Sequence, residues 1–214
     1  ERWLVDTVRQ LAERANVGMP EVAIYAGAPN AFATGAFRNR SLVAVSTGIM
    51  EQLTKEELKA VLGHELSHVA NGDMVTMTLV QGVLNAFVII LSRALAYVIA
   101  SAGRGEGRRR GTSGLYYPLV FAFDLALGVL ASLLVFAYSR RREYRADAGS
   151  ASLLGTSASM IAALKRLGNL KPGVLPDSLK AMGVAEGRRH ASLWSTHPSL
   201  EDRIAALERW TMAV

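Results

Sequence analysis

Two long apolar segments, residues 74–102 and 115–139, constrain the fold of this chain more than any other feature. Each is longer than the about 20 residues that a helix needs to cross the hydrocarbon core of a bilayer. The first contains Arg93 and the second Asp124, at similar depth counted from the connecting loop. We therefore predict a transmembrane helical hairpin with a buried Arg93–Asp124 pair, because two charges at that depth are best tolerated when paired. The alternative is a long amphipathic hairpin packed on a soluble domain.

Basic residues are clustered at the ends of these segments. The 214-residue chain has a formal net charge of +6, with four arginines in the connecting loop and four more within residues 140–145. Arginine clusters often bind nucleic acid. Here each cluster borders an apolar segment, which favours a lipid bilayer as the partner and no nucleic acid. Because the two clusters contain the same number of arginines, the positive-inside rule does not orient the hairpin.

The sequence before the hairpin is typical of an α+β domain that is mostly helical. Residues 2–16 have helical spacing of apolar side chains, and a second helix begins after Thr54, which forms a capping box with Glu57, and ends near Gly72. Three short apolar runs lie between these helices and predict a small antiparallel meander. The runs are residues 22–25, 31–36 and 42–46.

The sequence after the hairpin returns to the character of a soluble domain. Short helices are predicted over residues 156–167 and 176–182, and Ser199 with Asp202 caps a last helix. We expect residues 1–73 and 140–214 to be the two halves of one domain into which the hairpin 74–139 is inserted. The chain begins at Glu1 without a methionine, so we expect it to be a fragment of a longer protein.

The helix after Thr54 contains a pattern typical of a metal site, His64-Glu65-Leu66-Ser67-His68. Two histidines four residues apart lie side by side on a helix, where both imidazoles can bind one zinc ion. The residue after the first histidine projects beside the metal, where a carboxylate can take a proton from water. The alternative is a pair of ordinary helix histidines. Since the chain has no cysteine, further metal ligands must be His, Asp or Glu.

A third ligand is needed, because a catalytic zinc ion usually has three protein ligands and a water. The run "RREYRAD" supplies Glu143 and Asp147, which share one helical face. Glu143 can bind the metal while Asp147 accepts a hydrogen bond from a ligand histidine. Alternatively, both neutralise the surrounding arginines on a solvated face. If both apolar segments cross the bilayer, the chain returns to its starting side, and His68 and Glu143 can meet at one membrane surface.

Several runs in this order resemble the bacterial HtpX membrane metalloproteases, whose relatives include the CAAX prenyl proteases. These are "PNAFATG", "GHELSHVANGDMVTMTLVQG", "RREYRAD" and "STHPSLEDRIAAL". The resemblance implies a gluzincin, with a zincin-like metalloprotease domain that binds one Zn²⁺ per chain. HtpX proteins carry two further membrane segments before this point, and their absence agrees with a truncated chain.

The resemblance also implies roles for individual residues. His64, His68 and Glu143 would be the zinc ligands, Glu65 the general base and Asp147 a residue that orients a ligand. An extended polypeptide substrate would be laid on the edge strand at Asn30, Ala31 and Phe32, although from the sequence alone this run is a plain turn into a strand. His197 would lie near the metal and hold the oxyanion or the substrate, whereas His190 has no supporting context.

The function implied is a zinc metalloendopeptidase of the bacterial inner membrane. It would be a multi-pass protein with its active site in the cytosol, and it would clear misfolded or damaged membrane proteins under stress. Two other functions compete with this one: a zinc-stabilised membrane scaffold that binds proteins without cutting them, and a small transport module that uses Arg93 and Asp124. The intact Glu65 argues against the scaffold, and two membrane spans are few for a transporter. No pattern predicts a cleavage preference or an oligomeric state.

Overall fold

A computed structural model of the chain describes residues 1–102, 114–169 and 197–213. The predicted helix at 176–182, His190 and the arginines of the connecting loop lie outside these residues. The elements run from the N-terminus as α1 Arg2–Arg14, β1 Glu21–Tyr25, β2 Ala31–Phe37, β3 Arg40–Ser46, α2 Thr47–Gln52, α3 Lys55–Asn71, α4 Asp73–Ala102, α5 Tyr116–Leu154, α6 Ala158–Gly168 and α8 Leu200–Ala213.

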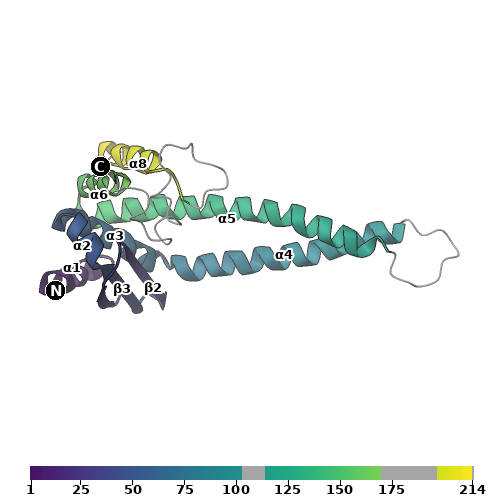
Figure 1. Ribbon diagram of the computed structural model, residues 1–214, viewed down its shortest axis with the longest axis horizontal. Helices are drawn as coiled ribbons and strands as arrows, with labels where there is room; N and C mark the ends of the chain where they lie inside the picture. The colour runs from purple at the N-terminus through teal and green to yellow at the C-terminus, as the bar shows by residue number, and fades with distance from the viewer. Residues whose placement is uncertain (103–113, 170–196, 214) are drawn as a thin grey trace.

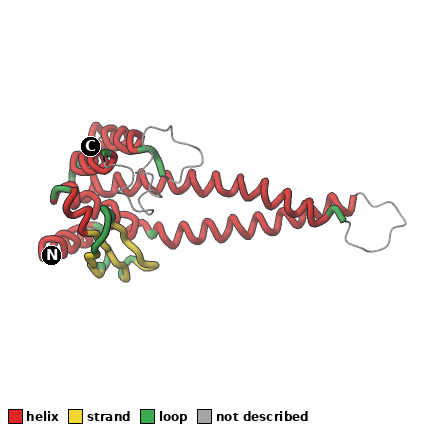
Figure 2. Tube along the Cα trace, viewed as in Figure 1, coloured by secondary structure: helices red, strands yellow, loops and turns green. Residues whose placement is uncertain are grey.

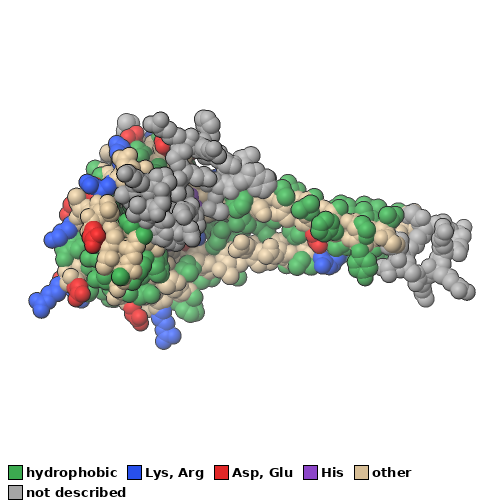
Figure 3. All heavy atoms as spheres, in the orientation of Figure 1, with side chains coloured by type: hydrophobic (Ala, Val, Ile, Leu, Met, Phe, Trp, Pro, Cys, Tyr) green, Lys and Arg blue, Asp and Glu red, His purple; other side chains and the backbone are tan. Residues whose placement is uncertain are grey.

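The molecule has a compact end from which a long helical hairpin projects. Figures 1 and 2 show α4 and α5 running side by side as this hairpin, with the sheet and the other helices gathered at its base. Only 17% of the most apolar window of α4 and 6% of that of α5 are buried by the fold. These helices are therefore not the core of a soluble domain, and both are long and apolar enough to cross a membrane. Apolar side chains cover much of the projecting shaft (Figure 3).

The predicted ion pair within the hairpin forms, but the protein itself does not bury it. Arg93 Nη1 lies 3.7 Å from Asp124 Oδ1, and their side chains are 50% and 38% exposed. Asp124 also accepts a hydrogen bond from Ser92 Oγ. The predicted pairing of the two charges is thus present, and burial of the pair by a surrounding bilayer stays a prediction.

The sheet has three strands, as predicted, but it is not an antiparallel meander. Its order is β1-β3-β2, in which β2 and β3 form an antiparallel hairpin and β1 is parallel to β3. The connection between β1 and β2 crosses the end of β3, where Gly27 C=O accepts from Gly48 N–H. This crossing leaves room for β3 between the first two strands. It also makes β2 a free edge strand.

The central helix of the compact end is α3, and its ends follow the predicted signals. Thr54 and Glu57 make both hydrogen bonds of a capping box, and Gly72 ends the helix with φ 66°. Apolar residues of α3 pack with α1, the sheet, α2 and α6 in one core. These residues include Leu58, Leu62 and Leu66. His64, Glu65 and His68 are therefore held on a helix that is buried in this core.

Candidate metal centre

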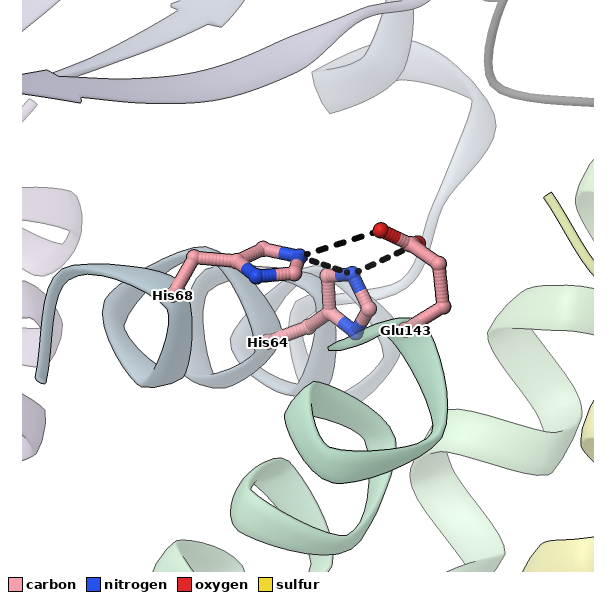
Figure 4. Close-up of side chains that lie close together, drawn as sticks. All are labelled: His64, His68 and Glu143. Carbon is pink, nitrogen blue, oxygen red and sulfur yellow. Dashed lines mark hydrogen bonds and ion pairs between the residues drawn. The ribbon is translucent and has the colours of Figure 1, made fainter. Parts of the chain in front are cut away.

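The two histidines of α3 lie together at the base of the hairpin, where α3 faces α5. The structure places His64 and His68 with their rings in contact, at 4.7 Å between centroids, and both point toward Glu143 (Figure 4). His64 is buried and His68 is partly buried. The helical placement predicted for this pair is confirmed.

Glu143 reaches the histidines because α5 does not end at the membrane segment. It continues as one helix through Glu143 and Asp147 to Leu154, and it packs closely on α3 through small residues. Ser150 Oγ donates to Ala60 C=O at 2.6 Å, and a Cβ added to Gly149 would lie 2.8 Å from Ser67 Cβ. The predicted face shared by Glu143 and Asp147 therefore points into the fold, and the alternative of a solvated face is wrong.

The three side chains fit a zinc ion. His64 Nε2 lies 3.1 Å from His68 Nε2 and 3.6 Å from Glu143 Oε2, while His68 Nε2 lies 3.5 Å from Glu143 Oε1. Ligand atoms at about 2.1 Å from a tetrahedral zinc ion are separated from one another by about 3.4 Å. The separation of the two imidazole nitrogens is close to this value, and one ligand atom from each of the three residues lies within 4.8 Å of the others. Two imidazoles and a carboxylate are also a donor set of open catalytic zinc sites.

The far nitrogen of His64 is held by a buried carboxylate that is itself held by an arginine. His64 Nδ1 lies 2.9 Å from Asp147 Oδ1. Arg203 of α8 binds the same carboxylate with two nitrogens, at 2.6 and 2.8 Å. Asp147 thus lies where the sequence predicted. The sequence analysis missed Arg203. A signal was present, because this charged residue lies on the same helical face as the apolar Leu200 and Leu207.

The far nitrogen of His68 has a matching arrangement. His68 Nδ1 lies 2.7 Å from Asp73 Oδ2, and Asp73 Oδ1 accepts from Arg145 Nη2 at 3.2 Å. Asp73 is 1% exposed although it is the first residue of α4. Sequence reasoning missed both residues, since "NGD" reads as a helix end. Each histidine is therefore oriented by an Asp–Arg pair, an arrangement that fixes the tautomer of a metal ligand.

The electrostatics of this cluster favour positive charge at its centre. Burial opposes charging of His64, but hydrogen bonds to Asp147 and Glu143 outweigh it and raise its pKa to about 9. Burial likewise opposes ionisation of Glu143, yet hydrogen bonds from His197 and His64 hold its pKa well below the ordinary value. The pKa of Asp147 is also lowered, chiefly by Arg203 acting against burial. Carboxylates that stay ionised here stabilise the charge that a metal ion brings.

Glu65 is positioned between the metal-type cluster and the edge strand. Its Oε2 accepts a hydrogen bond from Ala33 N–H of β2 at 3.1 Å. Ser46 N–H donates to Asn30 C=O, so in the antiparallel ladder the backbone of Phe32 faces β3 and that of Ala31 and Ala33 faces the free edge. The predicted residues Asn30, Ala31 and Phe32 therefore lie at the start of an edge strand that borders Glu65.

His197 enters the same cluster from the segment before α8. Its Nδ1 lies 3.5 Å from Glu143 Oε2, and its side chain is partly buried. The structure thus brings His197 together with the α3 and α5 residues, as the resemblance implied.

Comparison with known proteins identifies the family of the chain. The sequence profile of peptidase family M48 matches residues 1–211. The chain is 55% identical over 214 residues to a "Protease HtpX homolog" of Bordetella avium, covering 100% of this chain and 72% of the relative. It is 56% identical over 209 residues to that of Chlorobium limicola, covering 97% and 72%.

A solved structure shows the same fold at low sequence identity. The crystal structure of S. mikatae Ste24p matches with a TM-score of 0.65 and 21% identity, covering 95% of this chain. This chain spans 49% of the Ste24p chain, about half of its length. The fold class predicted from the sequence, mostly helical with a small sheet and a two-helix hairpin, is confirmed. On the profile match and these identities, the chain belongs to peptidase family M48, among the HtpX-type proteases.

Proposed function

We propose that this chain is a zinc-dependent endopeptidase of the bacterial cytoplasmic membrane that hydrolyses peptide bonds of misfolded or damaged membrane proteins. The observation that carries the proposal is the convergence of His64, His68 and Glu143, whose ligand-type atoms lie within 4.8 Å of one another. Zinc is typical of this peptidase family. The HtpX-type relatives support a membrane protease.

The residues of the cluster have separate roles in the proposed hydrolysis. His64, His68 and Glu143 would hold one zinc ion, which when bound would supply the Lewis acidity needed to activate water and polarise the scissile carbonyl. Glu65 takes a proton from the attacking water and returns it to the leaving amine. A buried carboxylate that directly follows His64 and is held by the N–H of Ala33 suits this role. His197 stabilises the oxyanion or holds the substrate.

Substrate binds as an added strand on β2. The outward carbonyl groups of Ala31 and Ala33 can accept hydrogen bonds from an extended peptide, which is β-augmentation. The peptide is then laid across Glu65, since Ala33 N–H already contacts that carboxylate. Asn30, Ala31 and Phe32 form the start of this binding edge.

The protease domain consists of residues 1–73 and 140–214, with the hairpin 74–139 crossing the membrane. The boundary near residue 139 falls inside the continuous helix α5, so the membrane span and the metal ligand are rigidly joined. The hairpin returns the chain to one side, which we assign to the cytosol by similarity to HtpX proteins. Substrates among membrane proteins fit an active site at the base of a membrane hairpin.

The test is zinc content and casein cleavage, measured on the same detergent-purified samples of three proteins. Wild type should bind one zinc and cleave casein. Glu65→Gln should keep zinc and lose cleavage, whereas Glu143→Ala should lose both, because one removes the base and the other a ligand. Unchanged zinc in Glu143→Ala would refute the ligand set. A zinc-loaded wild type that binds casein without cutting it would support the scaffold instead.

A further inference from the structure

A second feature of the edge strand is an apolar pocket beyond the catalytic residues. It has a volume of about 320 Å³ and is lined by β2 from Thr34 to Ala36 and by the first two turns of α4. The α4 wall consists of Met74, Val75, Thr78 and Leu79. Of these, Met74, Val75 and Leu79 are exposed apolar side chains. Apolar side chains left open beside a binding edge mark a site for an apolar ligand.

The pocket lies on the line that an added strand would follow. Ala33 N–H points to the free edge and contacts Glu65. Two residues on, Gly35 N–H also leaves the sheet and contacts Met74 Sδ at 3.3 Å. Strand residues rise about 3.3 Å each, so an extended peptide held at Ala33 reaches Met74 about two residues from the scissile bond.

From these positions we propose that the pocket between β2 and the start of α4 receives a large apolar side chain of the substrate, about two residues from the cleaved bond. The proposal rests on the proposed function and names its specificity. In β-augmentation the backbone gives affinity, and pockets for alternate side chains give selectivity. An apolar pocket suits the apolar side chains that are abundant in membrane proteins, and its α4 wall belongs to one of the two helices long and apolar enough to cross a membrane.

The competing occupant is a lipid chain, since the exposed apolar face of α4 continues past the pocket through Val83 and Phe87. The peptide is favoured because one wall is the edge strand itself. The backbone amides of a peptide can pair with this strand, whereas a lipid chain has none to offer.

The test uses Val75→Trp, which fills the pocket, and Val83→Trp, which adds the same side chain two turns along α4 outside it. Cut sites in casein are mapped by mass spectrometry for the wild type and both variants. Matched peptides are then made with Leu or Gly at the preferred position. We expect Val75→Trp to lower kcat/KM for the Leu peptide about tenfold while leaving the Gly peptide and the zinc content unchanged. Val83→Trp should resemble the wild type.

A second variant, Leu79→Ala, tests the pocket without introducing a bulky side chain. Leu79→Ala enlarges the pocket and should shift the preference from Leu toward Phe or Trp. A wild-type cut-site profile with no apolar preference, or Val75→Trp and Leu79→Ala profiles identical to the wild type, would overturn the proposal and leave the protease assignment standing. Absence of any cleavage by a zinc-loaded wild type would instead refute the proposed function.

Discussion

Gly149 on α5 sets the distance between the helices that carry the metal-type residues, and its replacement tests how the site is built. A Cβ at this position would lie 2.8 Å from Ser67 Cβ on α3 and still closer to Ser67 Oγ. Overpacking of this kind costs about 1–3 kcal/mol, whereas alanine gains about 1 kcal/mol over glycine in a helix. Gly149→Ala should therefore destabilise the protein by roughly 0–2 kcal/mol, the difference of these two terms.

Gly128→Ala is the matched control, since Gly128 lies in the same helix with nothing within 4 Å of an added Cβ. Both variants share the gain in helix propensity, so Gly149→Ala should be less stable than Gly128→Ala by the clash alone, about 1–3 kcal/mol. Thermal unfolding in detergent micelles measures this difference.

Zinc affinity gives the second readout, because the clash pushes α5, and with it Glu143, away from α3. A displaced ligand should weaken zinc binding about tenfold or more, as measured by titration against a competing chelator. Adding Ser67→Gly to Gly149→Ala should restore zinc affinity, because it removes the atoms that clash. Stability should recover only in part, because glycine is unfavourable within α3 and the Ser67 hydrogen bond to Gly63 C=O is lost. If Gly149→Ala matched Gly128→Ala in both measurements, the site would not depend on this helix contact.

Substitutions at three further positions test other contacts. Arg203→Met leaves the buried carboxylate of Asp147 without its bidentate partner, and thermal unfolding should show a loss of about 3–5 kcal/mol, with Arg203→Lys intermediate. Thr54→Ala removes the cap of α3 and should cost about 1 kcal/mol without changing zinc affinity. Burial opposes ionisation of Glu57, but hydrogen bonds from Thr54 and the Arg166 contact keep its pKa below the ordinary value. Its contribution is therefore present at neutral pH and lost as pH falls, so Glu57→Gln should be less stable than wild type at pH 7 and approach it in acid.

The residues predicted best from the sequence are those governed by local spacing. The limits of α3 follow from Thr54, Glu57 and Gly72, because capping and left-handed termination are decided within one turn. The histidine pair follows from helix geometry in the same way. The predicted strands also match the observed ones to within two residues at their ends.

Strand order was not predictable in this way. The antiparallel β2–β3 hairpin is formed by a short turn, which local signals indicate. Whether β1 pairs with β2 or with β3 depends on the path of the connection near Gly27, which is fixed by contacts with Gly48 after β3. No pattern within β1 itself distinguishes the two partners.

Arg203, Asp73 and Arg145 were missed for a related reason. Each acts through a contact between distant segments: Asp147 binds Arg203 across 56 positions and Asp73 binds Arg145 across 72. Spacing within a helix predicts which residues share a face, but not which charge from another element reaches that face. Of the three, only Arg203 had a signal in the sequence: a charged residue on an apolar helix face indicates a buried partner.

These two contacts explain why a membrane hairpin can interrupt the site without loosening it. Asp73 begins α4 and Arg145 lies on α5, so their pair joins the two helices of the hairpin at its base while holding His68. Asp147 and Arg203 join α5 to α8 while holding His64. Because His64 and His68 are tied to different pairs of helices, a shift of either helix of the hairpin would change the geometry of the cluster that they form with Glu143. The orientation of the two histidines is therefore a property of how α4, α5 and α8 pack at the base of the hairpin.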